Sequence, residues 1–153
     1  MPAKPTFDVL AAHRFFAADC FNKAWNLIEK QDRSPAEDRQ MIALNQASIF
    51  HWTQRPDCAP KNLSIGYWQA SRIHVLLGLV GEAKRYGQIC LDLSQGLDAF
   101  YLGYAHEALA RAEMAAGRQA EASAHLAKAR ALANQIADPA ERELLLADLA
   151  TLA

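Results

Sequence analysis

The sequence contains few cysteines and no arrangement of them that suggests a disulfide framework or a zinc cluster. Cys20, Cys58 and Cys90 are an odd number, lie far apart and form no C-x-x-C pair. Cys20 and Cys90 fall among apolar residues of expected helices, so we expect both to be buried as small hydrophobic residues. Cys58 falls in an expected loop between prolines, and we expect it to be more open to solvent.

The chain also lacks an excess of either charge and a long apolar run. Sixteen Lys and Arg residues stand against seventeen Asp and Glu residues, so nucleic acid is disfavoured as a partner. Arg72 and Glu82 interrupt the most hydrophobic region, which therefore falls short of the roughly 20 residues that span a bilayer. The first residues show no charged head followed by an apolar run, as an export signal would. We expect a cytoplasmic protein without a membrane segment.

Local signatures of catalysis, metal ligation and phosphate binding are missing from the sequence. There is no H-E-x-x-H pattern, no G-x-S-x-G elbow and no glycine-rich loop followed by Lys-Ser or Lys-Thr. Four histidines occur singly along the chain: His13, His74, His106 and His125. These observations favour a protein that is not an enzyme and has no cofactor or bound metal.

Helix-forming residues are abundant instead. Ala, Leu, Glu, Gln and Arg are frequent and alternating β-branched runs are missing, which predicts helix almost throughout. Proline, glycine and capping residues divide the chain into seven expected helices. These cover about residues 6–31, 35–54, 62–79, 82–94, 99–117 and 119–136, and a final segment that starts at about 139.

Capping residues and apolar spacing define the ends and inner faces of these helices. Ser34 to Glu37 has the capping-box arrangement, and Asp138 to Glu141 repeats it with aspartate at the cap, while Asp98 can cap the fifth helix. The expected inner face of the first helix consists of Phe7, Leu10, Ala11, Phe15, Ala18, Phe21, Trp25 and Ile28. That of the last helix consists of Leu144, Leu145, Leu149 and Leu152.

Small and large residues alternate in the later helices in an order that resembles tetratricopeptide repeats. One match comprises Leu109, Ala110, Gly117, Ala122, Leu126 and Ala129. A weaker one comprises Tyr67, Ser71, His74, Gly78, Ala83, Gly87 and Cys90. The resemblance covers roughly the last ninety residues. It implies that the helices stack as an α-α superhelix. From the helix pattern, the length and the lack of a linker, we expect an all-α fold of about seven antiparallel helices and a single domain over residues 1–153.

The resemblance also selects a candidate binding surface, because the first helix of each tetratricopeptide pair lines a concave groove. The corresponding positions here are Trp68, Arg72, Tyr104, Glu107 and Arg111. An arginine beside aromatic rings can hold a carboxylate or a small anion through paired hydrogen bonds. The resemblance thus implies a non-enzymatic binding or scaffold module that accepts a peptide or protein partner. The simpler alternative is that Trp68 packs in the core while Arg72 and Glu107 form an ion pair.

A second hypothesis is a small-molecule-binding or catalytic protein with a polar aromatic pocket. This pocket would gather His51, Trp52, Trp68, Gln69 and Arg72 beside the proline loop. Segments such as His51-Trp52 are similar to those of uncharacterised bacterial proteins, which bring no known activity. His51 can instead cap the carboxyl end of its helix while Trp52 closes the core, and we favour that role. A second copy of the chain is a further candidate partner, because helical stacks expose their terminal faces.

Overall fold

The computed structural model describes residues 1–152, which form seven α-helices and no β-strand. The prediction of an all-α protein is confirmed. The chain divides into two compact units, Met1–Ala59 and Pro60–Ala153, which are described separately. The prediction of a single domain stays a prediction, because neighbouring hairpins of one helical array can also form separate contact units.

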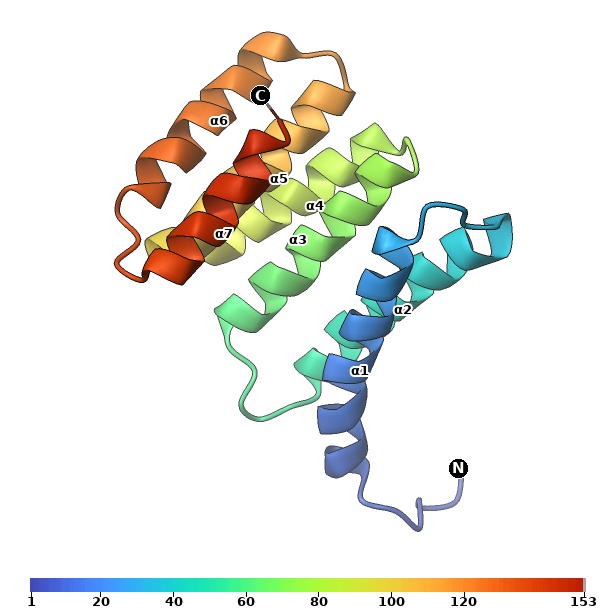
Figure 1. The fold of residues 1–153 in the computed structure, drawn as a ribbon. Helices are drawn as coiled ribbons and strands as arrows, with labels where there is room; N and C mark the ends of the chain where they lie inside the picture. Colours follow the sequence, from blue (N-terminus) through green and yellow to red (C-terminus); the bar gives the residue numbers. More distant parts are fainter. Residues whose placement is uncertain (153) are drawn as a thin grey trace. The chain divides into compact units, whose positions relative to one another are not determined.

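The first unit is an antiparallel pair of helices, α1 (Val9–Glu29) and α2 (Pro35–Thr53), drawn in blue and cyan in Figure 1. The predicted capping box at the start of α2 is confirmed. The amide of Glu37 donates to the Ser34 hydroxyl at 3.2 Å, and the amide of Ser34 donates to the Glu37 carboxylate at 2.9 Å. Two free amides of the first turn are thereby satisfied, which fixes where α2 begins.

The buried face of α1 differs from the prediction. Ala17, Cys20 and Ala24 are buried, and the Ser48 hydroxyl of α2 donates to the Ala17 carbonyl at 2.7 Å. Small residues let the two helices approach closely, so the contact follows them rather than the large apolar side chains. The residues wrongly predicted to face inward are Phe7, Leu10, Ala11, Phe15 and Ala18, which are exposed. Phe21, Trp25 and Ile28 are partly buried.

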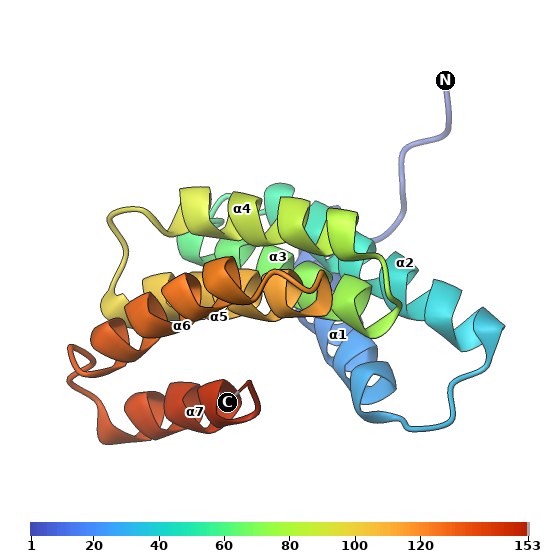
Figure 2. The same ribbon diagram turned by 90° about the horizontal axis from the view of Figure 1, so that it is seen from above.

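The second unit contains five helices that pack as successive neighbours. They are α3 (Pro60–Leu76), α4 (Val80–Ser94), α5 (Ala99–Ala115), α6 (Gln119–Ala133) and α7 (Pro139–Ala150). Helix α5 packs against both α3 and α4, and α7 packs against both α5 and α6. Figure 2 shows α7 (red) alongside α5 and α6 (orange). This order brings alternate helices α3, α5 and α7 next to one another, which positions the candidate site.

Glycines end α3 and α5 as the sequence predicted. Gly78 and Gly117 have φ of 72° and 74°, a left-handed conformation that glycine adopts without the steric cost of a Cβ. At the end of α3 the amide of Leu79 donates to the carbonyl of His74 at 2.8 Å, which satisfies a terminal carbonyl. Gly81 lies after this turn, as the second residue of α4.

Asp138 and Asp98, the other two predicted caps, differ in whether their side chains form capping hydrogen bonds. The Asp138 carboxylate accepts from the amides of Ala140 and Glu141 at 2.8 and 3.3 Å, so it caps α7 as predicted. Asp98 occupies the cap position of α5, but its side chain makes no capping hydrogen bond. The Asp98 carbonyl accepts the first helical bond instead, from Leu102 at 3.3 Å.

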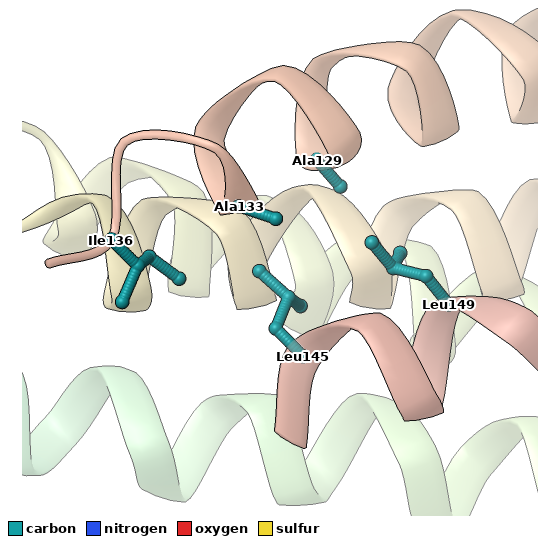
Figure 3. Packing of buried hydrophobic residues seen from close by; sticks show 5 residues of the cluster. All are labelled: Ala129, Ala133, Ile136, Leu145 and Leu149. Atoms are coloured by element: carbon teal, nitrogen blue, oxygen red, sulfur yellow. The ribbon is translucent and has the colours of Figure 1, made fainter. Parts of the chain in front are cut away.

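A small apolar core joins α5, α6 and α7. Figure 3 shows its buried members pointing toward one another: Ala129, Ala133, Ile136, Leu145 and Leu149. The predicted inward orientation is confirmed for Leu145, Leu149 and Leu152, which are buried, whereas Leu144 is 55% exposed and that part was wrong. A twelve-residue helix that packs along one face can bury only one stripe, and Leu144 lies outside it.

Gly103 of α5 allows α7 to approach closely. A Cβ added at Gly103 would lie 2.6 Å from Cδ2 of Leu145, which is fully buried. A contact this short would force the Leu145 side chain to move, so glycine favours the observed packing. The glycine therefore places the end of α7 beside the polar residues of α5.

Candidate functional site

The five residues selected for the concave face come together in the second unit. Trp68 and Arg72 are one turn apart on α3, and Tyr104, Glu107 and Arg111 follow at intervals of three and four on α5. Because α3 and α5 pack side by side, these two stripes face each other. Their role in binding stays a prediction, but their proximity is a structural fact.

Glu107 is the centre of this cluster. It is fully buried, and its carboxylate accepts the indole N–H of Trp68 at 2.8 Å. Its other oxygen accepts Nε and Nη2 of Arg111 at 2.8 and 2.6 Å. A buried carboxylate is tolerated only when charges and donors compensate for its lost hydration, and here an arginine and an indole do so. With both oxygens engaged, Glu107 is an anchor for other side chains rather than a free base.

Of the two arginines beside Glu107, Arg72 makes the weaker contact with its carboxylate, and Arg111 the stronger. The Nη1 atom of Arg72 lies 3.6 Å from the Glu107 carboxylate, which is an ion pair but too long for a hydrogen bond. This buried nitrogen has no hydrogen-bond partner among the described residues, while the side chain as a whole is 19% exposed. Burial and the neighbouring Arg111 lower the pKa of Arg72. One buried donor of the guanidinium is therefore unsatisfied, while another part of the side chain reaches the surface.

The last helix supplies two members of the cluster that the sequence analysis missed. The Tyr104 hydroxyl donates to the Asp148 carboxylate at 2.7 Å, and Arg111 Nη2 donates to the Thr151 hydroxyl at 3.0 Å. Burial and the bond to Asp148 raise the pKa of Tyr104 well above its usual range. The cluster across α3, α5 and α7 thus contains two arginines and two carboxylates, so its formal charges balance: Arg72, Arg111, Glu107 and Asp148.

Aromatic rings of α3 and α5 pack against one another in this cluster. The rings of Trp68 and Tyr104 meet edge to face with centroids 5.4 Å apart, and Phe100 packs on Tyr104 at 5.1 Å. The simpler alternative is confirmed for the Arg72–Glu107 ion pair, but Trp68 is only partly buried. The arrangement is an arginine–carboxylate cluster with packed aromatic rings at its border, and an arginine of such a cluster can pair with a carboxylate.

The other predicted site residues are placed differently. Gln69 of α3 is fully buried. His51 and Trp52 belong to the first unit, so a shared pocket with Trp68 and Arg72 stays a prediction. Trp52 is partly buried, and the Arg55 guanidinium lies 3.8 Å above its ring.

His51 pairs with His13 across the α1–α2 hairpin. Their Nδ1 atoms are 2.8 Å apart, so one ring donates and the other accepts. Burial and the nearby His13 lower the pKa of His51. That shift disfavours the charged imidazolium on which the predicted helix-capping role depends.

A second histidine pair lies between α5 and α6. His106 and His125 place their Nδ1 atoms 3.0 Å apart. Burial, together with His125 and Lys128, lowers the pKa of His106 to about 4. These histidines occur singly in the sequence, but His13 and His51, like His106 and His125, are roughly equidistant from the turn of their hairpin. That symmetry is the signal that could have predicted both contacts.

A buried carboxylate in the same unit has two cationic neighbours. Glu113 is 2% exposed, and Lys84 Nζ lies 2.7 Å from its Oε1. Arg118 Nε lies 3.2 Å from Oε2 without the alignment of a hydrogen bond. These contacts join α4 to the end of α5 and account for the charge of Glu113 by ion pairing.

Within residues 1–152, no group of three or more His, Cys, Asp or Glu side chains is arranged to hold a metal ion. Over the same residues, no helix has both the length and the apolar character required to cross a bilayer. Cys20 and Cys90 are buried free thiols as predicted, and Cys58 is a partly buried free thiol in its loop. No protein-family model matches the sequence, and no significant match was found among curated proteins or solved structures.

Proposed function

We propose that this chain is a non-catalytic binding module that captures a carboxylate of a peptide or protein partner on the face formed by α3, α5 and α7. The observation that carries the proposal is the state of Arg72, whose side chain is partly exposed and whose buried Nη1 has no hydrogen-bond partner among the described residues. A partner carboxylate would pair with the exposed part of this guanidinium, whose ion pair with Glu107 is 3.6 Å long.

The packing order of the helices supports a tetratricopeptide-like arrangement as part of this proposal. In such stacks the first helices of successive pairs lie side by side and form a shared recognition surface. Helices α3, α5 and α7 are adjacent in this way, with α4 and α6 packed behind α5. Residues from separate hairpins can then contact one extended ligand, as in other modules that bind peptides on a helical surface.

Rigid neighbours favour recognition over catalysis at this face. Glu107 and Arg111 are fixed by mutual hydrogen bonds, and Tyr104 is fixed by Asp148. Side chains that are already ordered lose little entropy when a ligand binds, so they contribute to affinity through preorganisation. Arg72, which has no such bond, is the residue that a ligand would complete.

The test is a binding screen against immobilised peptides that carry a free carboxylate, each beside its amidated counterpart. We expect the wild-type chain to bind carboxylate peptides and not their amides. Arg72→Gln should lose about tenfold to a hundredfold in affinity, since one charged hydrogen bond contributes about 1.5–3 kcal/mol. Arg85→Gln is the matched control, because Arg85 lies on α4 with 69% of its side chain exposed.

Two results would overturn the proposal. Equal binding of free and amidated peptides would show that the carboxylate is not recognised. Full affinity of the Arg72 variant, with unchanged helicity by circular dichroism, would show that binding occurs elsewhere.

A further inference from the structure

The cluster around Glu107 contains a second carboxylate, Asp148, which the proposed capture of a partner carboxylate leaves unused. Oδ2 of Asp148 accepts the Tyr104 hydroxyl at 2.7 Å. Among residues 1–152, no hydrogen bond reaches the other oxygen, Oδ1, and this atom is not one of the buried polar atoms without a partner. Asp148 is partly exposed. Its carboxylate therefore has an acceptor oxygen left for a ligand.

Arg72 and Asp148 reach α5 from two different helices. Helix α5 packs against both α3 and α7, whereas α3 and α7 do not pack against each other. From α3, Nη1 of Arg72 lies 3.6 Å from the Glu107 carboxylate, and from α7 the Asp148 carboxylate binds Tyr104. Tyr104 and Glu107 are one turn apart on α5. The face formed by α3, α5 and α7 therefore carries a cation from one flanking helix and a carboxylate from the other.

The charge of Asp148 acts on the guanidinium that is proposed to bind the ligand. Burial and Arg111 lower the pKa of Arg72, whereas Glu107 and Asp148 raise it. A ligand carboxylate that pairs with Arg72 therefore also meets repulsion from Asp148, and salt screens such repulsion little where the groups are partly buried. A positive group on the same ligand would pair with Asp148 and offset this repulsion.

The width of one helix sets the spacing of the two charges on such a ligand. Arg72 and Asp148 both contact side chains of α5, and a helix with its side chains is about 10–12 Å wide. In an extended peptide, residues two positions apart point to the same side and lie about 7 Å from each other. The long, flexible side chains of glutamate and lysine can cover the remaining distance. An acidic and a basic residue two positions apart therefore fit this face.

We infer that the site takes a dipolar peptide segment, in which an acidic side chain pairs with Arg72 and a basic side chain two residues away pairs with Asp148. This inference rests on the proposed function, because it assigns the second charge of the ligand that is captured at Arg72. A purely acidic segment would place a negative charge beside Asp148, and a purely basic one would place a positive charge beside Arg72. Both kinds of segment are thereby disfavoured relative to the dipolar one.

The test compares the binding of four fluorescently labelled peptides, each acetylated at its amino end and amidated at its carboxyl end. Two positions, separated by one serine, hold glutamate and lysine, glutamate and glutamine, glutamine and lysine, or two glutamines. In fluorescence polarisation, the wild-type chain should bind the glutamate–lysine peptide about tenfold more tightly than the glutamate–glutamine peptide, the factor that one charged hydrogen bond contributes. The two peptides without glutamate should bind most weakly.

Asp148→Asn should abolish the preference for lysine, so that both peptides with glutamate bind alike. The amide oxygen of asparagine can still accept the Tyr104 hydroxyl, so the contact between α7 and α5 is kept. Asp92→Asn is the matched control, because Asp92 is an exposed carboxylate of α4 that also accepts one neutral donor, from Gln88 at 2.9 Å. This control should keep the tenfold preference, and circular dichroism should show unchanged helicity in both variants.

The outcomes separate this inference from the proposed function. Equal binding of the two peptides with glutamate by the wild-type chain, a result that needs no variant, overturns the dipolar ligand and leaves carboxylate capture standing. A preference for lysine that persists in Asp148→Asn, or that Asp92→Asn also loses, overturns the assignment to Asp148. Equal binding of all four peptides, or of none, overturns carboxylate capture and this inference with it.

Discussion

Glu107→Gln is the most informative single change in the second unit, because it removes one charge from the centre of the cluster with little change of shape. The native carboxylate accepts three hydrogen bonds, from Trp68 and Arg111, and pairs with Arg72. Glutamine has only one acceptor oxygen. Its amide NH2 group must therefore face the N–H of Trp68 or Arg111, from which it cannot accept a hydrogen bond. Two guanidinium groups then lose their buried counter-charge.

The magnitude follows from the contacts that are lost. Hydrogen bonds to a charged group contribute about 1.5–3 kcal/mol each, and removing one partner of a buried ion pair typically costs 3–5 kcal/mol. Since glutamine retains part of the hydrogen bonding, we expect the free energy of unfolding to fall by about 3 kcal/mol. For a chain of this length the midpoint of thermal unfolding should fall by about 10 °C.

The assay is urea unfolding followed by far-ultraviolet circular dichroism, with the wild-type chain and Glu82→Gln as controls. Glu82 is half exposed and lies 3.6 Å from Arg85, so its replacement should change stability by less than about 0.5 kcal/mol. A double-mutant cycle with Trp68→Phe should give a coupling of about 1 kcal/mol for the indole bond. A loss below about 1 kcal/mol for Glu107→Gln would mean that the buried carboxylate does not stabilise the second unit.

Three further changes test other parts of the fold. Gly103→Ala should destabilise by about 1 kcal/mol, since overpacking outweighs the gain in helix propensity, whereas Gly81→Ala, with open space around it, should stabilise slightly in thermal unfolding. The pKa of His106 is about 4 in the native state and about 6.5 in the unfolded chain, so between these pH values only the unfolded chain binds the proton. The free energy of unfolding should therefore fall as pH drops from about 6.5 toward 4. His106→Asn should flatten that profile. Ser34→Ala should cost about 1 kcal/mol in urea unfolding through loss of the capping box.

Helix number and many helix ends could be predicted because they depend on local chemistry. Ser34 and Asp138 act on amides within three residues, and glycine permits a positive φ at Gly78 and Gly117 whatever surrounds it. The expected and observed helix ends differ mainly where apolar residues continue beyond the last helical residue. Ile136 illustrates this, because it lies after α6 yet is buried in the core with Leu145.

The inner face of α1 could not be predicted from apolar spacing alone. Large side chains such as Phe15 suggested one stripe, but the helix contact is set by the small residues Ala17 and Ala24. Close approach depends on the partner helix, here through Ser48, which local periodicity does not contain.

The candidate site could be predicted only in part for the same reason. One-turn spacing placed Trp68 with Arg72 and Glu107 with Arg111, since spacing within a helix is fixed. The contributions of Asp148 and Thr151 depend on how α7 packs, and the packing of α7 depends on the absence of a side chain at Gly103. No local pattern encodes that contact.

The bonds that α7 makes to α5 have a consequence for how the second unit opens. Terminal helices of stacked arrays usually fray first, because they have a neighbour on one side only. Here Tyr104 and Arg111 bind the last helix to the carboxylate network that also includes α3. Separation of α7 would remove hydrogen-bond partners from Tyr104 and Arg111. Amide hydrogen exchange in α7 should therefore be nearly as slow as in α5. The second unit should open cooperatively rather than from its end.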